Sequence, residues 1–204
     1  MGLQLSFIKK NWHDINPFLL RSFKEAFQEG KLSISQTQGV ITCLPKDGKP
    51  KHFLKNWRPI SLLNVDYKIV STCIANRIKK VLDHLISETQ TGFMKGRYIG
   101  ECTRLIYDLL KKVDEEDIPG LLVLLDFEKA FDSLEWNFIC ETLKFLGFGD
   151  TIVKWFTTLY YNSKSCIQNN GYLSDFFVIE RGYDKGIHCL PIFLFYVWNC
   201  LVHQ

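Results

Sequence analysis

Residues 121–132 read Leu121-Leu122-Val123-Leu124-Leu125-Asp126-Phe127-Glu128-Lys129-Ala130-Phe131-Asp132, an unbroken apolar run followed by three carboxylates. The dipeptide Pro119-Gly120, which favours a turn, precedes the run. A bounded apolar run of this kind is typical of a strand that is buried on both faces. A carboxylate directly after such a strand stands at the end of a sheet. The sequence therefore predicts a central strand that ends at an acidic site around Asp126.

Helices and one further strand are predicted before this segment. Asn16-Pro17 resembles an N-cap followed by proline at the first helical position, and Gly30 would end that helix. Residues 40–44 form a β-branched, apolar run that predicts a short strand closed by the Asp47-Gly48 turn. Apolar residues at helical spacing predict two more helices, over 66–85 and through 105–113.

Mixed elements are predicted after it. Asp132 or Ser133 can cap a helix, with Glu135 placed to close a capping box. Another helix is predicted from about Asp150, and Asn170-Gly171 favours a hairpin between two short strands. The order of the elements predicts an α+β fold.

Composition excludes few functions. The chain has 204 residues, of which 47% are hydrophobic and 23% charged, as in an ordinary globular domain. The formal net charge of +3 is too small to argue for a nucleic-acid partner by itself. None of the seven cysteines forms a pair with the two-residue spacing of zinc or redox motifs, so free thiols are predicted. The first residues show no secretory signal pattern.

The acidic segment admits a catalytic and a structural interpretation. Phosphoryl transfer depends on metal ions that hold and neutralise phosphates, and carboxylates bridge the two ions of such sites. Asp126 is a candidate metal ligand, but one aspartate cannot hold two ions. An aspartate at a strand end or a helix start also serves turns and caps, and for Asp132 the cap is favoured.

Two basic groups could contact nucleic acid. Lys49, Lys51 and Lys55 lie between Lys46 and Arg58, with Asp47 as the opposing charge, and Trp57 adjoins Arg58. A second group, Lys95-Gly96-Arg97, follows Gly92-Phe93. Lysine and arginine bind phosphates, and an adjacent aromatic ring can stack on a base. From the residues alone, a solvated, lysine-rich loop is favoured over a binding site.

The end of the chain is apolar from Ile187 to Val202, with interruptions at His188, Pro191 and Asn199. This is shorter than the roughly 18 uninterrupted apolar residues of a membrane span. A buried helix is favoured over a membrane anchor, and no stable membrane association is expected.

Five segments, in this order, resemble the reverse transcriptase of non-long-terminal-repeat (LINE-type) retrotransposons. They are Gly39-Val40-Ile41-Thr42-Cys43-Leu44-Pro45-Lys46, Asn56-Trp57-Arg58-Pro59-Ile60-Ser61-Leu62-Leu63-Asn64, Gln90-Thr91-Gly92-Phe93-Met94-Lys95-Gly96-Arg97, Leu125-Asp126-Phe127-Glu128-Lys129-Ala130-Phe131-Asp132, and Asn169-Asn170-Gly171-Tyr172 through Glu180-Arg181-Gly182. The resemblance covers nearly the whole chain up to Gly186. It implies a right-hand polymerase fold with a fingers-like region over 1–120. A partial palm over 121–204 follows, with a divergent apolar tail from about 187 and no thumb.

The resemblance also implies roles for particular residues. Asp126 would be the catalytic aspartate that coordinates two magnesium ions, with the backbone carbonyl of Phe127 as a further ligand. The Phe131 ring would exclude a ribose 2′-hydroxyl. Lys46 and Arg58 would grip the incoming triphosphate. The template contacts would be Lys95 and Arg97. The implied partners are an RNA template, a DNA primer and deoxynucleoside triphosphates.

The chain departs from the family pattern near its end. Asp184-Lys185 stands where the family usually has Arg-Gln, and the sequence contains no two adjacent aspartates, which the family's next block supplies. We therefore expect this chain to be catalytically incomplete alone. The alternatives are a non-catalytic nucleic-acid-binding relic of a decayed element and a small protein that associates with membranes through its tail. An intracellular location, nuclear or cytoplasmic, is expected.

Overall fold

The computed structural model describes residues 5–92, 94, 96–124 and 134–181. The N-terminal part contains helices α1 (Leu5–Lys10), α2 (Trp12–Glu29) and α3 (Ile34–Thr37). Gly30 ends α2 in a left-handed conformation with φ 72°, as predicted. The predicted start was wrong, because α2 begins at Trp12 and contains Pro17. Proline has no N–H to donate to the carbonyl four residues earlier, here that of His13, and its ring crowds that carbonyl, so α2 contains Pro17 at some cost.

Among the described residues, five short strands form a sheet in the order β2-β1-β3-β4, with β5 also paired to β3. The strands are β1 (Gln38–Pro45), β2 (Trp57–Leu63), β3 (Lys164–Asn169), β4 (Tyr172–Leu173) and β5 (Phe177–Val178). β1 pairs antiparallel with β2 and parallel with β3. The strand expected over 40–44 is therefore confirmed, and it is one of the two inner strands of the described sheet.

β2 was not predicted, because Pro59 argues against a strand. Pro59 lies opposite Cys43, and β2 is an edge strand of the described sheet, where one side needs no partner. The predicted hairpin at Asn170-Gly171 is confirmed. Both residues have positive φ, 48° and 83°, and the chain returns along β3 as β4 and β5.

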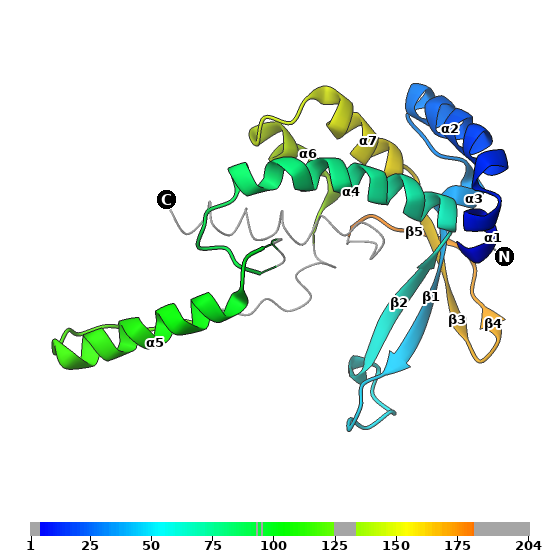
Figure 1. Cartoon of the computed structure of the whole chain (residues 1–204). Coiled ribbons are helices and arrows are strands. Elements are labelled where there is room, and N and C mark those ends of the chain that lie inside the picture. Colours follow the sequence, from blue (N-terminus) through cyan, green and yellow to red (C-terminus); the bar gives the residue numbers. More distant parts are fainter. Residues whose placement is uncertain (1–4, 93, 95, 125–133, 182–204) are drawn as a thin grey trace.

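The core joins three helices at one end of the strands, and the β1–β2 hairpin extends away from them (Figure 1). These helices are α4 (Val65–Leu85), α6 (Trp136–Phe145) and α7 (Asp150–Tyr160). Their most deeply buried apolar side chains are those of Ile78, Leu143, Phe156 and Leu159. The predicted helices over 66–85 and from Asp150 are confirmed.

The start of α6 differs from the prediction. Asp132 and Ser133 lie outside the described residues, and Glu135 itself occupies the N-cap position, so the expected capping box does not form. Glu135 has an extended backbone and forms a β-bridge with Arg181. This bridge holds Glu135 outside the helix, which therefore begins at Trp136.

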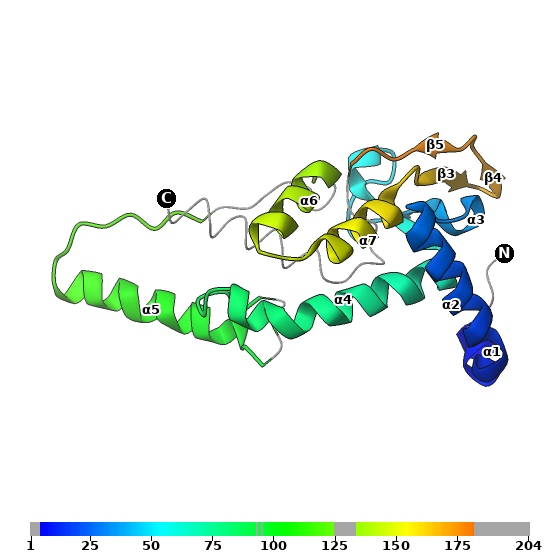
Figure 2. The same ribbon diagram turned by 90° about the horizontal axis from the view of Figure 1, so that it is seen from above.

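Helix α5 (Ile99–Glu115) projects from the other described elements (Figures 1 and 2), and none of its residues is buried. The helix predicted through 105–113 is thus confirmed. The strand predicted over 121–125 is wrong for residues 121–124, which form no strand and are exposed, Leu121 by 88% and Leu124 by 79%. An apolar strand needs neighbours on both sides, and no strand of the described residues pairs with this segment. The described part as a whole is α+β, as expected.

Candidate nucleotide and nucleic-acid interface

Three of the predicted site residues belong to the described structure, and four do not. Lys46 follows β1, Arg58 lies in β2, and Arg97 precedes α5. Lys95, Asp126, Phe127 and Phe131 lie outside the described residues, so the structure does not relate the predicted acidic site to the basic one. Of the described site residues, Lys46 and Arg58 therefore lie together on the β1–β2 hairpin, and Arg97 lies elsewhere.

Lys46 and Arg58 lie on the same face of the β1–β2 hairpin. Leu44 pairs with Arg58 across the two strands, and the Lys46 amide donates to the Asn56 carbonyl at 2.8 Å, which extends the same register. Because side chains alternate along a strand, Lys46 and Leu44 face the same side, and so does Arg58. The two cations are diagonal neighbours, whose positions are typically about 7–8 Å apart. One triphosphate can span such a separation.

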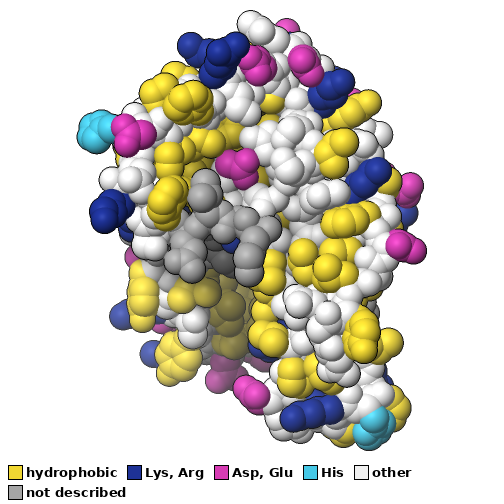
Figure 3. Space-filling view, turned by 90° about the vertical axis from the view of Figure 1, so that its right-hand side faces the viewer, with side chains coloured by type: hydrophobic (Ala, Val, Ile, Leu, Met, Phe, Trp, Pro, Cys, Tyr) yellow, Lys and Arg dark blue, Asp and Glu magenta, His cyan; other side chains and the backbone are white. Residues whose placement is uncertain are grey.

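The loop of residues 46–56 between these strands is basic, and its lysines are not neutralised. Lys49, Lys51 and Lys55 are exposed, and within the described ranges none of them forms an ion pair. By contrast, Lys111 and Lys112 on α5 each pair with the glutamate four residues later, at 3.5 and 3.9 Å. Figure 3 shows basic side chains beside apolar ones at the lower end of the molecule, where the hairpin ends. The hairpin loop therefore carries positive charges that form no ion pair within the described ranges.

Phe53 carries an exposed phenyl ring in this loop, whereas the sequence motif pointed to Trp57. The Trp57 indole N–H points inward and donates to the Lys51 carbonyl at 2.7 Å, and the side chain is half-buried. Phe53 is 49% exposed, its ring centroid lies 4.1 Å from that of His52, and the Lys55 ammonium lies 5.4 Å from it. An apolar ring inside a run of lysines was the signal that could have identified Phe53.

Arg97 holds the turn that follows α4. Its guanidinium donates to the Ser87 carbonyl, to the Gln90 carbonyl at 2.7 Å and to the Ile86 carbonyl at 3.3 Å. These carbonyls lie just beyond the C-terminus of α4, where backbone acceptors lack helical partners. Arg97 thus has a structural role, and its contact with a template stays a prediction.

Arg97→Ala is expected to lower the free energy of unfolding by about 2 kcal/mol, because three carbonyls lose a charged donor. Arg104→Ala on α5 is the matched control. Its side chain is 83% exposed, and its ion pair within the described ranges is with Asp108, so the expected loss is below about 0.5 kcal/mol. Urea denaturation measures both. Equal losses would mean that the Arg97 hydrogen bonds do not stabilise the fold.

The metal-binding part of the prediction falls on Asp126 and Phe127. Among the residues that the structure describes, no group of three or more histidine, cysteine, aspartate or glutamate side chains could hold a metal ion. Burial raises the pKa of the Cys140 thiol, against a smaller lowering by Lys144, so this thiol stays protonated at neutral pH and is a poor nucleophile. Among the described residues, the candidate site thus consists of the basic side chains of the hairpin and the Phe53 ring.

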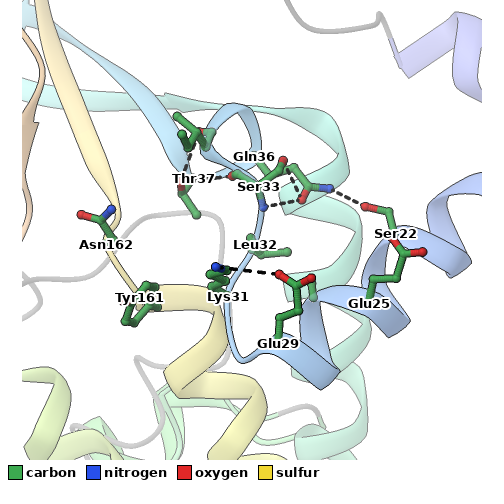
Figure 4. Close-up of a pocket in the computed structure, with 12 residues that line it drawn as sticks. Ser22, Glu25, Glu29, Lys31, Leu32, Ser33, Gln36, Thr37, Tyr161 and Asn162 are labelled. Atoms are coloured by element: carbon green, nitrogen blue, oxygen red, sulfur yellow. Dashed lines mark hydrogen bonds and ion pairs between the residues drawn. The ribbon is translucent and has the colours of Figure 1, made fainter.

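A pocket of about 460 Å³ lies at the end of α2, beside α3 and the residues after α7 (Figure 4). Glu29 and Lys31 pair across 3.9 Å at its rim, and Gln36 donates to the Ser22 hydroxyl at 3.4 Å. None of the predicted site residues lines this pocket. The pocket is therefore separate from the predicted nucleotide-binding residues.

No helix within the described ranges is long and apolar enough to cross a membrane. The apolar tail from about 187 lies outside those ranges.

Comparison with known families identifies the class. Residues 44–202 match the family described as reverse transcriptase (RNA-dependent DNA polymerase). The match covers well over half of the chain, which therefore belongs to this family.

Similar curated proteins come from retrotransposons. The chain is 35% identical over 185 residues to the uncharacterized 149 kDa protein of transposon TX1 from Xenopus laevis, covering 91% of this chain and 14% of that protein. It is 30% identical over 101 residues to the probable RNA-directed DNA polymerase from transposon BS of Drosophila melanogaster, covering 48% of this chain and 11% of that protein. It is 26% identical over 157 residues to the Pol polyprotein of retrotransposable element R2 from Popillia japonica, covering 76% of this chain and 21% of that protein.

These relatives place the domain among the non-long-terminal-repeat, LINE-type reverse transcriptases, as the motifs predicted. The chain spans only 11–21% of the length of these three relatives.

Proposed function

We propose that this chain contributes the nucleotide-gripping fingers and the first catalytic aspartate of an RNA-directed DNA polymerase, and that it does not polymerise alone. The fingers would extend over residues 1–120, and a partial palm over 121–204. The observation that carries the proposal is the β1–β2 hairpin, which holds Lys46 and Arg58 on one face beside un-neutralised lysines. The family's substrates are an RNA template, a DNA primer and deoxynucleoside triphosphates.

Each group has a definite task in this proposal. Lys46 and Arg58 bind the triphosphate oxygens and orient the incoming nucleotide. The Lys46 ammonium donates one hydrogen bond to the Lys55 carbonyl at 2.9 Å, and an ammonium has two further donors for phosphate. Phe131 excludes a 2′-hydroxyl by its bulk. The template is contacted by Lys95 and Arg97.

The acidic residues fit a magnesium site only in part. Carboxylate and carbonyl oxygens, such as those of Asp126 and Phe127, are ligands that magnesium prefers. When bound, magnesium would neutralise the phosphates during transfer. A site for two ions needs carboxylates in addition to Asp126, and the sequence offers no adjacent aspartates to supply them. Hence we propose incomplete ligation in this chain.

Primer extension tests this proposal. The chain and its Asp126→Ala variant are incubated with an RNA template, a DNA primer, deoxynucleotides and magnesium. Neither is expected to extend the primer, although both give a cooperative thermal transition. Magnesium-dependent extension by the chain that Asp126→Ala abolishes would contradict incompleteness, and would mean that another source, such as a second copy, supplies the missing carboxylates.

A second candidate function is nucleic-acid binding without catalysis, as in a relic of a decayed element. The replacement of the family's Arg-Gln by Asp184-Lys185 favours it, because it reverses one charge near the expected phosphate path. The two candidates differ when the missing palm residues are added as a separate chain. Restored extension supports an incomplete polymerase, whereas binding without extension supports a relic.

A further inference from the structure

The loop of residues 46–56 is tied down by three side chains that donate to its own backbone. The Asn56 amide donates to the Pro50 carbonyl at 2.7 Å, and the Trp57 indole donates to the Lys51 carbonyl at 2.7 Å. The Lys46 ammonium donates to the Lys55 carbonyl at 2.9 Å. All three donors stand at the base of the loop, where β1 ends and β2 begins.

These bonds fix the backbone and leave the charged side chains exposed. The acceptors are main-chain carbonyls, whereas Lys49, Lys51 and Lys55 remain exposed to solvent. The loop forms only a single turn of 3-10 helix, Leu54–Asn56, so most of its backbone has no regular partner. The side-chain hydrogen bonds of Asn56 and Trp57 thus fix loop backbone that the sheet does not hold.

Such an arrangement matters for binding because ordering a loop costs free energy. If the loop is ordered before the ligand arrives, that cost is not subtracted from the affinity. The position of both donors next to Arg58 links the order of the loop to the face that carries the cations.

We propose that Asn56 and Trp57 are positioning residues, which act through the lysine-rich loop to preorganise it for the phosphates of a nucleic acid. The inference rests on the proposed nucleic-acid function. Neither residue touches the ligand. Loss of either bond frees the loop, lowers the affinity, and reduces the number of phosphates that the lysines neutralise together.

The test compares Trp57→Phe, which removes the N–H donor and keeps an aromatic ring, with the full wild-type chain. Trp155→Phe on α7 is the matched control, because Trp155 is also half-buried and its ring packs on that of Phe27, with the centroids 4.8 Å apart, outside the hairpin. Asn56→Leu, which keeps the branched shape of the side chain and has no donor, is the second variant. Fluorescence anisotropy measures binding of a labelled RNA–DNA primer–template over a series of KCl concentrations. Trypsin cleavage after Lys51 and Lys55 measures the order of the loop.

Trp57→Phe and Asn56→Leu are each expected to weaken binding about three- to tenfold. The slope of log affinity against log salt is expected to become shallower by about one for each phosphate that the lysines no longer neutralise. Trypsin should cleave the loop faster in both variants, and Trp155→Phe should change neither quantity. A defect of global stability alone would leave the salt slope unchanged.

Two outcomes overturn the inference while the proposed function stands. One is binding by Trp57→Phe and Asn56→Leu with the wild-type affinity and salt slope. The other is faster cleavage of the loop without any change in binding. If the folded wild-type chain does not bind the primer–template at all, the proposed nucleic-acid function fails first. In that case the trypsin result still shows whether the two side chains order the loop.

Discussion

Replacing Phe156 by alanine is expected to lower the free energy of unfolding by about 3–5 kcal/mol. The ring is fully buried among the apolar side chains of α4, α6 and α7, including Ile78 and Leu143, and lies 6.3 Å from the ring of Tyr160. Its removal loses apolar burial and leaves a cavity that rigid helices cannot close. Since domains are stable by only about 5–15 kcal/mol, the variant should approach complete unfolding at physiological temperature.

Phe145→Ala is the matched control, because this side chain on α6 is 76% exposed. Its expected loss is within about 0.5 kcal/mol. Thermal and urea denaturation of both variants measure the difference. Similar losses for the two would mean that the three-helix cluster is not the stabilising core of the chain.

Neutralising the three lysines of the hairpin loop, by Lys49→Gln, Lys51→Gln and Lys55→Gln together, is expected to weaken nucleic-acid binding about a hundredfold near 0.1 M salt. Each lysine that contacts a phosphate releases a counterion, and each contributes about 0.7–0.9 to the salt slope. These lysines form no ion pair within the described ranges, so their full charge is available to the ligand.

The control removes the same charge elsewhere. Lys111, Lys112 and Lys144 pair with Glu115, Glu116 and Glu141 at 3.5, 3.9 and 4.0 Å. Their triple change to glutamine should weaken binding much less, because their charges are already offset locally. Anisotropy with the primer–template measures both triple variants. An equal loss would show that net charge, and not the hairpin, determines the affinity.

Local signals predicted most of the elements, and non-local pairing explains the failures. The helix over 66–85 and the turn at Asn170-Gly171 follow from periodicity and from positive φ, which act within a few residues. The segment 121–124 has the composition of a strand, but the composition does not state whether neighbouring strands exist to pair with it. The prediction missed β2 for the opposite reason. Pro59 is unfavourable in most strands but is tolerated in an edge strand, and the position of β2 at the edge follows from the whole sheet.

For the candidate site, the sequence proposes residues, whose roles stay predictions, but it does not give their contacts. Lys46 and Arg58 were identified from motifs, and their common face follows from a strand register that the sequence does not state. The inward direction of the Trp57 indole and the carbonyl contacts of Arg97 depend on turns of irregular backbone. Irregular turns have no periodicity from which such hydrogen bonds could be inferred.

The inner strand β1 also sets the order in which the chain can assemble. β2 follows β1 closely in the sequence, but β3, the other neighbour of β1, is distant. Gly39 in β1 and Cys166 in β3 are separated by 127 positions. At about 5–20 residues per second, a ribosome needs roughly 6–25 s to make the intervening chain. Throughout that interval the second edge of β1 remains open to pairing with other chains. A product interrupted before Lys164 would keep that edge permanently, so the described sheet is completed only by residues 164–178.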